Sequence, residues 1–280
     1  MKTNKNYYQF KFYGWTGVFI ILAAEILLFL NFEPVKIFFT PIAWTGYILF
    51  IDAVLYKLNG SSYLMNRRKE FLFMLLMSLI CWLIFEAYNI HLQNWKYINL
   101  PENMLIRLVG YGWSFITITP GIILTSELID SWEIFDRIKI KKFAISKLTL
   151  NFWVIIGALF LIIPVFLPRS YAQYLFVLIW IGFVFLLDPI NSYLGKHSLF
   201  VDLRDGKINK LLSLFLSGII CGFLWEFWNY WALTKWIYTL PFLENPRIFE
   251  MPLAGFLGFL PFAVECYVMW VFSLSLIKKR

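Results

Sequence analysis

The chain has 280 residues, of which 60% are hydrophobic and only 15% are charged, and its mean hydropathy is +0.69. A soluble domain has about 45–50% apolar and about 25% charged residues, so this composition excludes a protein that faces water on all sides. The three cysteines, Cys81, Cys221 and Cys266, lie in apolar runs, and the two histidines are far apart. This pattern excludes a secreted disulfide scaffold, and no metal site and no cofactor is expected.

Eight stretches are long enough to cross a bilayer, which needs about 20 apolar residues of helix. They are residues 13–32, 37–56, 71–91, 105–128, 149–167, 171–193, 211–231 and 251–277. The fourth holds Gly110, Gly112, Pro120 and Gly121, so we expect a kinked or broken helix there. The first lacks a small-residue cleavage pattern and is expected to be a retained helix.

The basic residues are distributed unevenly between the two predicted sides of the membrane. The net charge is +8, and 19 of the 25 Lys and Arg residues fall on the side that carries both chain ends. The other side has Lys36, Lys96, Arg107, Arg169, Lys235 and Arg247. By the positive-inside rule, both ends are cytoplasmic in a multi-pass protein of the cell membrane. The charge therefore predicts membrane topology, and no nucleic-acid partner is expected.

The sequence resembles itself at a spacing near 140 residues. Cys81, Glu86 and Asn89 align with Cys221, Glu226 and Asn229, and a Trp-x-Tyr sequence follows each group at Trp95 and Trp236. This pattern predicts two repeats, residues 1–140 and 141–280, with four helices each. An even number of helices gives both repeats the same orientation. The predicted fold is an all-α integral membrane protein with about eight transmembrane helices in two parallel four-helix repeats.

Carboxylates inside a bilayer are costly and are candidates for function. Glu226 shares a helix stripe with Gly218 and Gly222, so we expect it to face other helices rather than lipid. Asn229, three residues on, is placed to hydrogen-bond it, and Glu86 with Asn89 repeats the arrangement. The alternative is that these polar pairs only join helices.

Four other features add candidates. Glu265 lies near the middle of the eighth helix, on a stripe of small residues. Asp188 precedes a proline near the cytoplasmic end of the sixth helix, and it either ends that helix or contacts a long lipid. Glu250 either caps the predicted start of the eighth helix or contacts a ligand. The Trp-x-Tyr loops either anchor the protein at the interface or form a lid.

These observations give two sets of candidate residues. The candidate acids and bases are Glu86, Glu226 and Glu265. The candidate substrate contacts are Asn89, Asn229, Trp95, Trp236, Tyr238, Glu250 and Asp188. The expected surroundings are a lipid bilayer, and the expected ligand is a long apolar lipid.

The stretch from Gly222 through Trp236-Ile-Tyr238 to Glu265 resembles a recurring family of bacterial multi-pass membrane proteins of unassigned function. More distantly, it is similar to the membrane-type lycopene cyclase domain, which is often duplicated and has a Trp-x-Tyr loop. That family has a Pro-x-Glu-Glu helix start where this chain has Pro252-Leu-Ala. The resemblance implies a non-redox cyclase or isomerase that acts on an isoprenoid or related lipid through acid–base carboxylates.

Two other functions stay open at this point. Parallel repeats and mid-membrane carboxylates also suit a proton-coupled transporter or lipid carrier. A non-catalytic membrane assembly partner is the third alternative, because the chain carries no diagnostic catalytic motif. The sequence does not specify the substrate or the oligomeric state.

Overall fold

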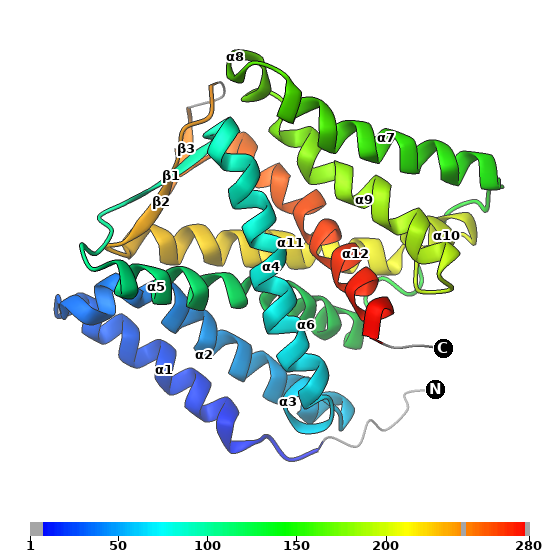
Figure 1. The fold of residues 1–280 in the computed structure, drawn as a ribbon. Coiled ribbons are helices and arrows are strands. Elements are labelled where there is room, and N and C mark those ends of the chain that lie inside the picture. Colours follow the sequence, from blue (N-terminus) through cyan, green and yellow to red (C-terminus); the bar gives the residue numbers. More distant parts are fainter. Residues whose placement is uncertain (1–7, 242–244, 278–280) are drawn as a thin grey trace.

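The computed structural model describes residues 8–241 and 245–277, and it is 74% helical with almost no sheet (Figure 1). Within these ranges, eight helical segments are long and apolar enough to cross a membrane, which confirms the predicted number. They are α1 (Phe12–Phe29), α2 (Glu33–Asn59), α4 (Arg68–Leu92), α5 (Met104–Ile116) with α6 (Ile118–Ser131), α7 (Lys147–Phe166), α9 (Phe176–Tyr193), α11 (Asn209–Trp231), and η1 (Leu253–Gly258) with α12 (Phe259–Ile277). Three short helices lie in the connections, α3 (Tyr63–Asn66), α8 (Arg169–Ala172) and α10 (Leu199–Arg204).

The chain ends carry part of the charge asymmetry on which the predicted topology depends. Lys2, Lys5 and residues 278–280 enter that count, and they lie outside the described residues. Figure 1 shows strands β1 (Trp95–Ile98), β2 (Lys235–Tyr238) and β3 (Arg247–Ile248) together at one end of the bundle, away from α3 and the last turn of α12.

The fourth membrane segment is broken at Thr117, as its glycines and proline predict. Pro120 has no backbone N–H to donate and disfavours a continuous helix across this point. The Ser78 hydroxyl of α4 donates to the Phe115 carbonyl at 2.6 Å and accepts from the Thr119 N–H at 3.0 Å. A neighbouring helix thus satisfies backbone groups that the break leaves free, which is what allows a break inside a membrane.

Two predicted helices begin later than expected. The sixth is predicted from residue 171, but α8 ends at Ala172 and α9 begins at Phe176. The eighth is predicted from Met251, but Met251–Pro252 forms strand β4, which pairs antiparallel with β3. The η1 segment therefore starts only after this hairpin. Glu250 lies before β4, so the expectation that it caps the eighth helix is wrong.

Each half of the chain contains a close helix pair built on glycines. A Cβ atom added to Gly17 of α1 would lie 2.4 Å from the Gly46 carbonyl oxygen of α2. A Cβ atom added to Gly157 of α7 would lie 2.7 Å from the Gly182 carbonyl oxygen of α9. Such distances exclude any side chain, so these small residues set the approach of the helices.

Each half also has a buried aspartate that holds a short helix. Asp52 accepts hydrogen bonds from the Ser62 hydroxyl at 2.7 Å and the Leu64 N–H at 3.2 Å, next to α3. Asp188 accepts from the Ser198 hydroxyl at 2.7 Å and from the N–H groups of Leu199 and Phe200, both at 2.8 Å, at the start of α10. These bonds satisfy N–H groups that have no partner within a first helical turn.

The two Trp-x-Tyr loops meet as a pair of strands. Strands β1 and β2 pair antiparallel, with Trp95 opposite Tyr238 and Tyr97 opposite Trp236. Below them, α6, α11 and α12 pack against one another and against α2 and α4. This arrangement places one strand from each half of the chain side by side at one end of the bundle.

Candidate functional site

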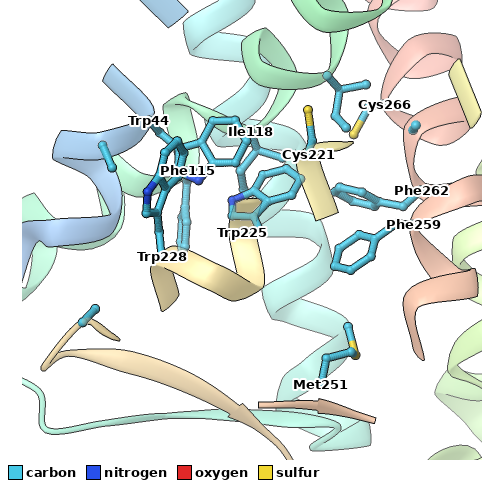
Figure 2. Packing of buried hydrophobic residues seen from close by; sticks show 14 of the residues in the cluster. Trp44, Phe115, Ile118, Cys221, Trp225, Trp228, Met251, Phe259, Phe262 and Cys266 are labelled. Carbon is cyan, nitrogen blue, oxygen red and sulfur yellow. The ribbon is translucent and has the colours of Figure 1, made fainter. Parts of the chain in front are cut away.

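An aromatic pocket lies between the paired strands and the helices, and its empty space, with the open solvent at its mouth included, is about 1140 Å³. Its lining comes from both halves of the chain, and about half of the lining residues are aromatic. Figure 2 shows part of it, where Trp44 of α2, Trp225 of α11 and Phe259 and Phe262 of α12 lie close together. Among the described residues, three charged side chains line this pocket, Glu226, Arg107 and Lys235. It is therefore a mainly apolar site with few charges.

Glu226 is the carboxylate of this pocket. Its side chain is 0% exposed, as the glycine stripe of α11 predicts, and Gly222 one turn earlier lies directly against the Phe259 ring. Oε1 accepts a hydrogen bond from the Tyr238 hydroxyl at 2.8 Å, while Oε2 has no partner among the described residues. A buried oxygen without a partner is unfavourable, so this atom is available to a proton or a ligand.

Glu86 makes the corresponding contacts in the other half but does not line the pocket. It is half-buried, and its Oε1 accepts from Trp82 Nε1 at 2.9 Å, Trp95 Nε1 at 3.1 Å and the Tyr97 hydroxyl at 2.6 Å. These three side chains do line the pocket. Glu86 thus holds three rings of the pocket wall.

The two asparagines bind strand backbone instead of the glutamates. Asn229 Nδ2 donates to the Trp236 carbonyl at 2.9 Å, and its Oδ1 accepts from the Trp236 N–H at 3.0 Å. Asn89 Nδ2 donates to the Trp95 carbonyl at 2.9 Å, and its Oδ1 accepts from the N–H groups of Asn94 at 2.8 Å and Trp95 at 3.3 Å. The expected Asn–Glu hydrogen bonds do not form among the described residues. Each asparagine fixes a strand to the end of its own helix.

Tyr97 and Tyr238, here called the strand tyrosines, stay protonated. Burial raises the pKa of both hydroxyls well above its ordinary value, and the neighbouring Glu86 and Glu226 carboxylates raise it further. A protonated hydroxyl donates to a carboxylate. Trp236 Nε1 in turn donates to the Tyr238 hydroxyl at 3.1 Å. The glutamates, asparagines and aromatic side chains therefore form one hydrogen-bonded clamp around β1 and β2.

The remaining predicted site residues lie outside the pocket lining. Glu265 of α12 is 0% exposed, and neither of its carboxylate oxygens has a partner among the described residues. Asp188 holds α10. Glu250 forms an ion pair with Lys235 and so lies beside the pocket rim. Within the described ranges, no group of three His, Cys, Asp or Glu side chains is placed to hold a metal ion.

Sequence reasoning missed Arg107, Trp44 and Trp180, all of which line the pocket. A Cβ atom on Gly121 would lie 2.8 Å from the Trp44 ring, and one on Gly258 would lie 2.5 Å from the Trp180 ring. Trp44 and Trp180 have the same separation in the sequence as Asp52 and Asp188. That equal separation is a sequence signal for the two tryptophans, whereas nothing in the sequence distinguishes Arg107 from the other basic residues of its predicted side.

No family model, no curated protein and no solved structure matches this chain. Inference about its function therefore depends on the geometry of the pocket.

Proposed function

We propose that the chain is a membrane-embedded, non-redox enzyme of the cyclase or isomerase type, which acts on an isoprenoid or related long apolar lipid. The observation that carries the proposal is Glu226, a fully buried carboxyl group in a mainly aromatic pocket, with one oxygen that has no partner among the described residues. Pockets of such apolar lining bind apolar ligands, and their few polar groups fix orientation or perform chemistry.

In this proposal, the protonated Glu226 carboxyl donates its proton to a carbon–carbon double bond of the lipid. The resulting carbocation forms a new carbon–carbon bond or shifts its charge, and then returns a proton to the Glu226 carboxylate. The product is an isomer of the substrate, so no oxidant or reductant is consumed. The faces of Trp44 and Trp225, which line the pocket, stabilise the cation by cation–π attraction.

The clamp has a supporting role in the same proposal. Tyr238 is the described hydrogen-bond donor to Glu226 Oε1, so it orients the carboxyl group. Glu86 acts through the three pocket-wall side chains that it holds. Four strand side chains, Trp95, Tyr97, Trp236 and Tyr238, line the pocket, and in this proposal they shield the reacting part of a bound lipid from water, which strengthens electrostatic interactions there.

The first experiment tests whether lipid occupies the pocket. Wild-type protein is purified with its bound lipids, and the extract is compared with the parent membrane by mass spectrometry. Gly110→Leu adds a side chain inside the pocket, because Gly110 lines it, whereas a Cβ atom on Gly112 meets nothing within 4 Å and Gly112 does not line the pocket. We expect an enriched apolar lipid in wild type and in Gly112→Leu, and its loss in Gly110→Leu. Equal lipid in all three proteins would refute pocket binding.

The second experiment tests the chemistry. The enriched lipid and a panel of isoprenoids are incubated with wild type and with Glu226→Gln, and isomers are separated by chromatography. We expect the variant to keep the bound lipid and to lose turnover, because a glutamine side chain cannot donate the proton. Unchanged turnover in Glu226→Gln would remove this residue from the mechanism.

We further propose that residues 1–140 and 141–280 are parallel repeats with both ends of the chain in the cytoplasm of a cell. Three features recur at corresponding positions in the two halves. They are the glycine contacts between paired helices, the buried aspartates that hold short helices, and the hydrogen bonds from the strand tyrosines to glutamates. The test is a topology assay with reporters fused separately to the two ends. Reporters on opposite sides would contradict the proposal.

A proton-coupled carrier is the second candidate, favoured by Glu265. A carboxyl group whose two oxygens are buried without partners is stable only in the neutral form, and such groups serve in proton relays. In proteoliposomes, solute movement by a carrier would depend on a pH gradient in wild type but not in Glu265→Gln. Movement that is independent of the gradient in both proteins would exclude this candidate.

A further inference from the structure

Arg107 is the one basic residue of the pocket lining, among the described residues, that has no carboxylate partner. It is the fourth residue of α5, and its Nε and Nη2 atoms donate to the Pro101 carbonyl at 3.2 Å and 2.8 Å. The other cation of the lining, Lys235, is paired with Glu250. A guanidinium group has five N–H donors, so most of the donors of Arg107 remain available to a ligand after these two hydrogen bonds to Pro101.

One face of α5 lines the pocket over more than two turns. The lining residues are Ile106, Arg107, Gly110, Tyr111, Ser114 and Phe115, which recur at the three- and four-residue spacing of a single helix face. At 1.5 Å per residue, Arg107 and Phe115 lie about 12 Å apart along the helix. Arg107 is thus at one end of an elongated wall whose other end is aromatic.

The two halves of the chain differ at this point. Arg247 stands 140 residues after Arg107, and Pro241 stands 140 residues after Pro101. Arg247 is in strand β3, is exposed and does not line the pocket. Among the described residues, an arginine lines the pocket from the first half and a carboxyl group, Glu226, lines it from the second half. The pocket therefore has one cationic position without a carboxylate partner, Arg107, since Lys235 is paired with Glu250, and this asymmetry gives a bound lipid one orientation.

We propose that Arg107 binds the anionic head of the lipid ligand, and that this head is a phosphate or diphosphate ester; the inference depends on the lipid pocket of the proposed function. A guanidinium group binds two phosphate oxygens at once, and such charge-assisted hydrogen bonds are short and strong. Glu250 is paired with Lys235, and Arg107 forms no ion pair with the described residues, so its positive charge is available to an anionic group in the pocket. The hydrocarbon chain then lies along the aromatic wall of the pocket.

The test uses two ligands with the same chain, farnesyl diphosphate and farnesol, and the free anion, inorganic diphosphate. Binding is measured by quenching of tryptophan fluorescence in nanodiscs of phosphatidylcholine, so that no anionic bilayer lipid competes. We expect wild type to bind farnesyl diphosphate at least tenfold more tightly than farnesol, and not to bind inorganic diphosphate at the same concentrations. Equal affinity for the two farnesyl ligands would overturn the inference.

Three arginine variants make the test specific. Arg107→Gln should lose the tenfold preference and keep its affinity for farnesol, and Arg107→Lys should keep part of the preference. Arg169→Gln should behave as wild type, because Arg169 is an exposed outer arginine that does not line the pocket. If Arg107→Gln keeps the preference for farnesyl diphosphate over farnesol, groups other than Arg107 are responsible for that preference, and the inference is overturned.

The remaining outcomes separate this inference from the proposed function. If the protein binds farnesol and shows no preference for farnesyl diphosphate, Arg107 is not a binding site for an anionic head, but the proposed lipid pocket still stands. Binding of inorganic diphosphate as tight as that of farnesyl diphosphate would identify a free anion as the ligand. If neither farnesyl ligand binds, and Gly110→Leu also carries the same lipids as wild type, both the inference and the proposed function fail.

Discussion

Replacing Asn229 by alanine should loosen β2 from α11 and lower the stability of the protein. The side chain is 0% exposed and makes two hydrogen bonds, both to the backbone of Trp236. The variant leaves the part-buried N–H and carbonyl of Trp236 without these partners. A buried unsatisfied group costs about 1–3 kcal/mol, whereas side-chain hydrogen bonds in a membrane protein average about 0.6 kcal/mol. We therefore expect a loss of roughly 2–4 kcal/mol for the two groups.

Asn89→Ala provides the matched comparison in the other half. Asn89 makes three hydrogen bonds, but its side chain is only half-buried. Water replaces part of the lost bonding at such a site, so we expect a smaller loss of roughly 1–2 kcal/mol. The burial of the asparagine side chain, and not its number of hydrogen bonds, should therefore decide which of the two variants loses more stability.

The measurement is thermal unfolding in one detergent, followed by tryptophan fluorescence. For chains of 150–250 residues, about 1 kcal/mol corresponds to roughly 2–4 °C in Tm, so Asn229→Ala should lower Tm by about 4–16 °C. Asn209→Ala is the control, because its side chain donates to Asp136 at an exposed site. If Asn229→Ala shifts Tm as little as Asn209→Ala, or less than Asn89→Ala, the reasoning from burial is wrong.

Three further predictions concern the helix break, a close helix contact and the strand tyrosines. Ser78→Ala removes the bridge across the break and should lower stability by roughly 1–3 kcal/mol, whereas Ser273→Ala, which loses only a bond within its own helix, should change little in the same thermal assay. Gly157→Ala places a Cβ atom 2.4 Å from the Leu186 nitrogen and should lower Tm by an amount equivalent to about 1–3 kcal/mol. Gly112→Ala is the control and should be neutral or slightly stabilising. Equal changes in Tm for the two variants would refute the packing argument. Because the pKa of both strand tyrosines is raised in the folded protein, the folded state binds more protons than the unfolded state above pH about 10. The contribution of the two tyrosines to the free energy of unfolding should therefore stay level below that pH and fall above it. In denaturant unfolding at increasing pH, the double variant Tyr97→Phe/Tyr238→Phe should show a shallower fall in stability than wild type.

Part of the fold was predictable because it depends on local properties of the sequence. The length and apolarity of each segment determine that eight of them can cross a membrane. The glycines and Pro120 of the fourth segment predicted its break, since a proline without an N–H interrupts a helix wherever the rest of the chain lies. The late start of the eighth helix was not predictable in this way, because the β3–β4 hairpin depends on pairing with residues outside the apolar run.

The sequence indicated some side chains of the candidate site but not their hydrogen-bonding partners. The sequence pointed to Glu226, Asn229, Trp236 and Tyr238, which the structure brings together. It paired each asparagine with its glutamate, whereas the structure pairs each asparagine with strand backbone. The hydrogen-bonding partner of a side chain depends on where a later segment returns, and helix spacing alone does not contain that information.

Composition and segment length by themselves determined that this protein is mainly helical, with eight segments that are long and apolar enough to cross a membrane. Only the tertiary structure decided which carboxyl group faces the pocket. Glu86 and Glu226 occupy matching positions in the sequence, yet one is enclosed by three donors and the other has a free oxygen. The physical reason is that helices apolar on every side bury whichever face their neighbours cover, so the partner helices and strands, and not the pattern along one helix, fix the environment of each acid.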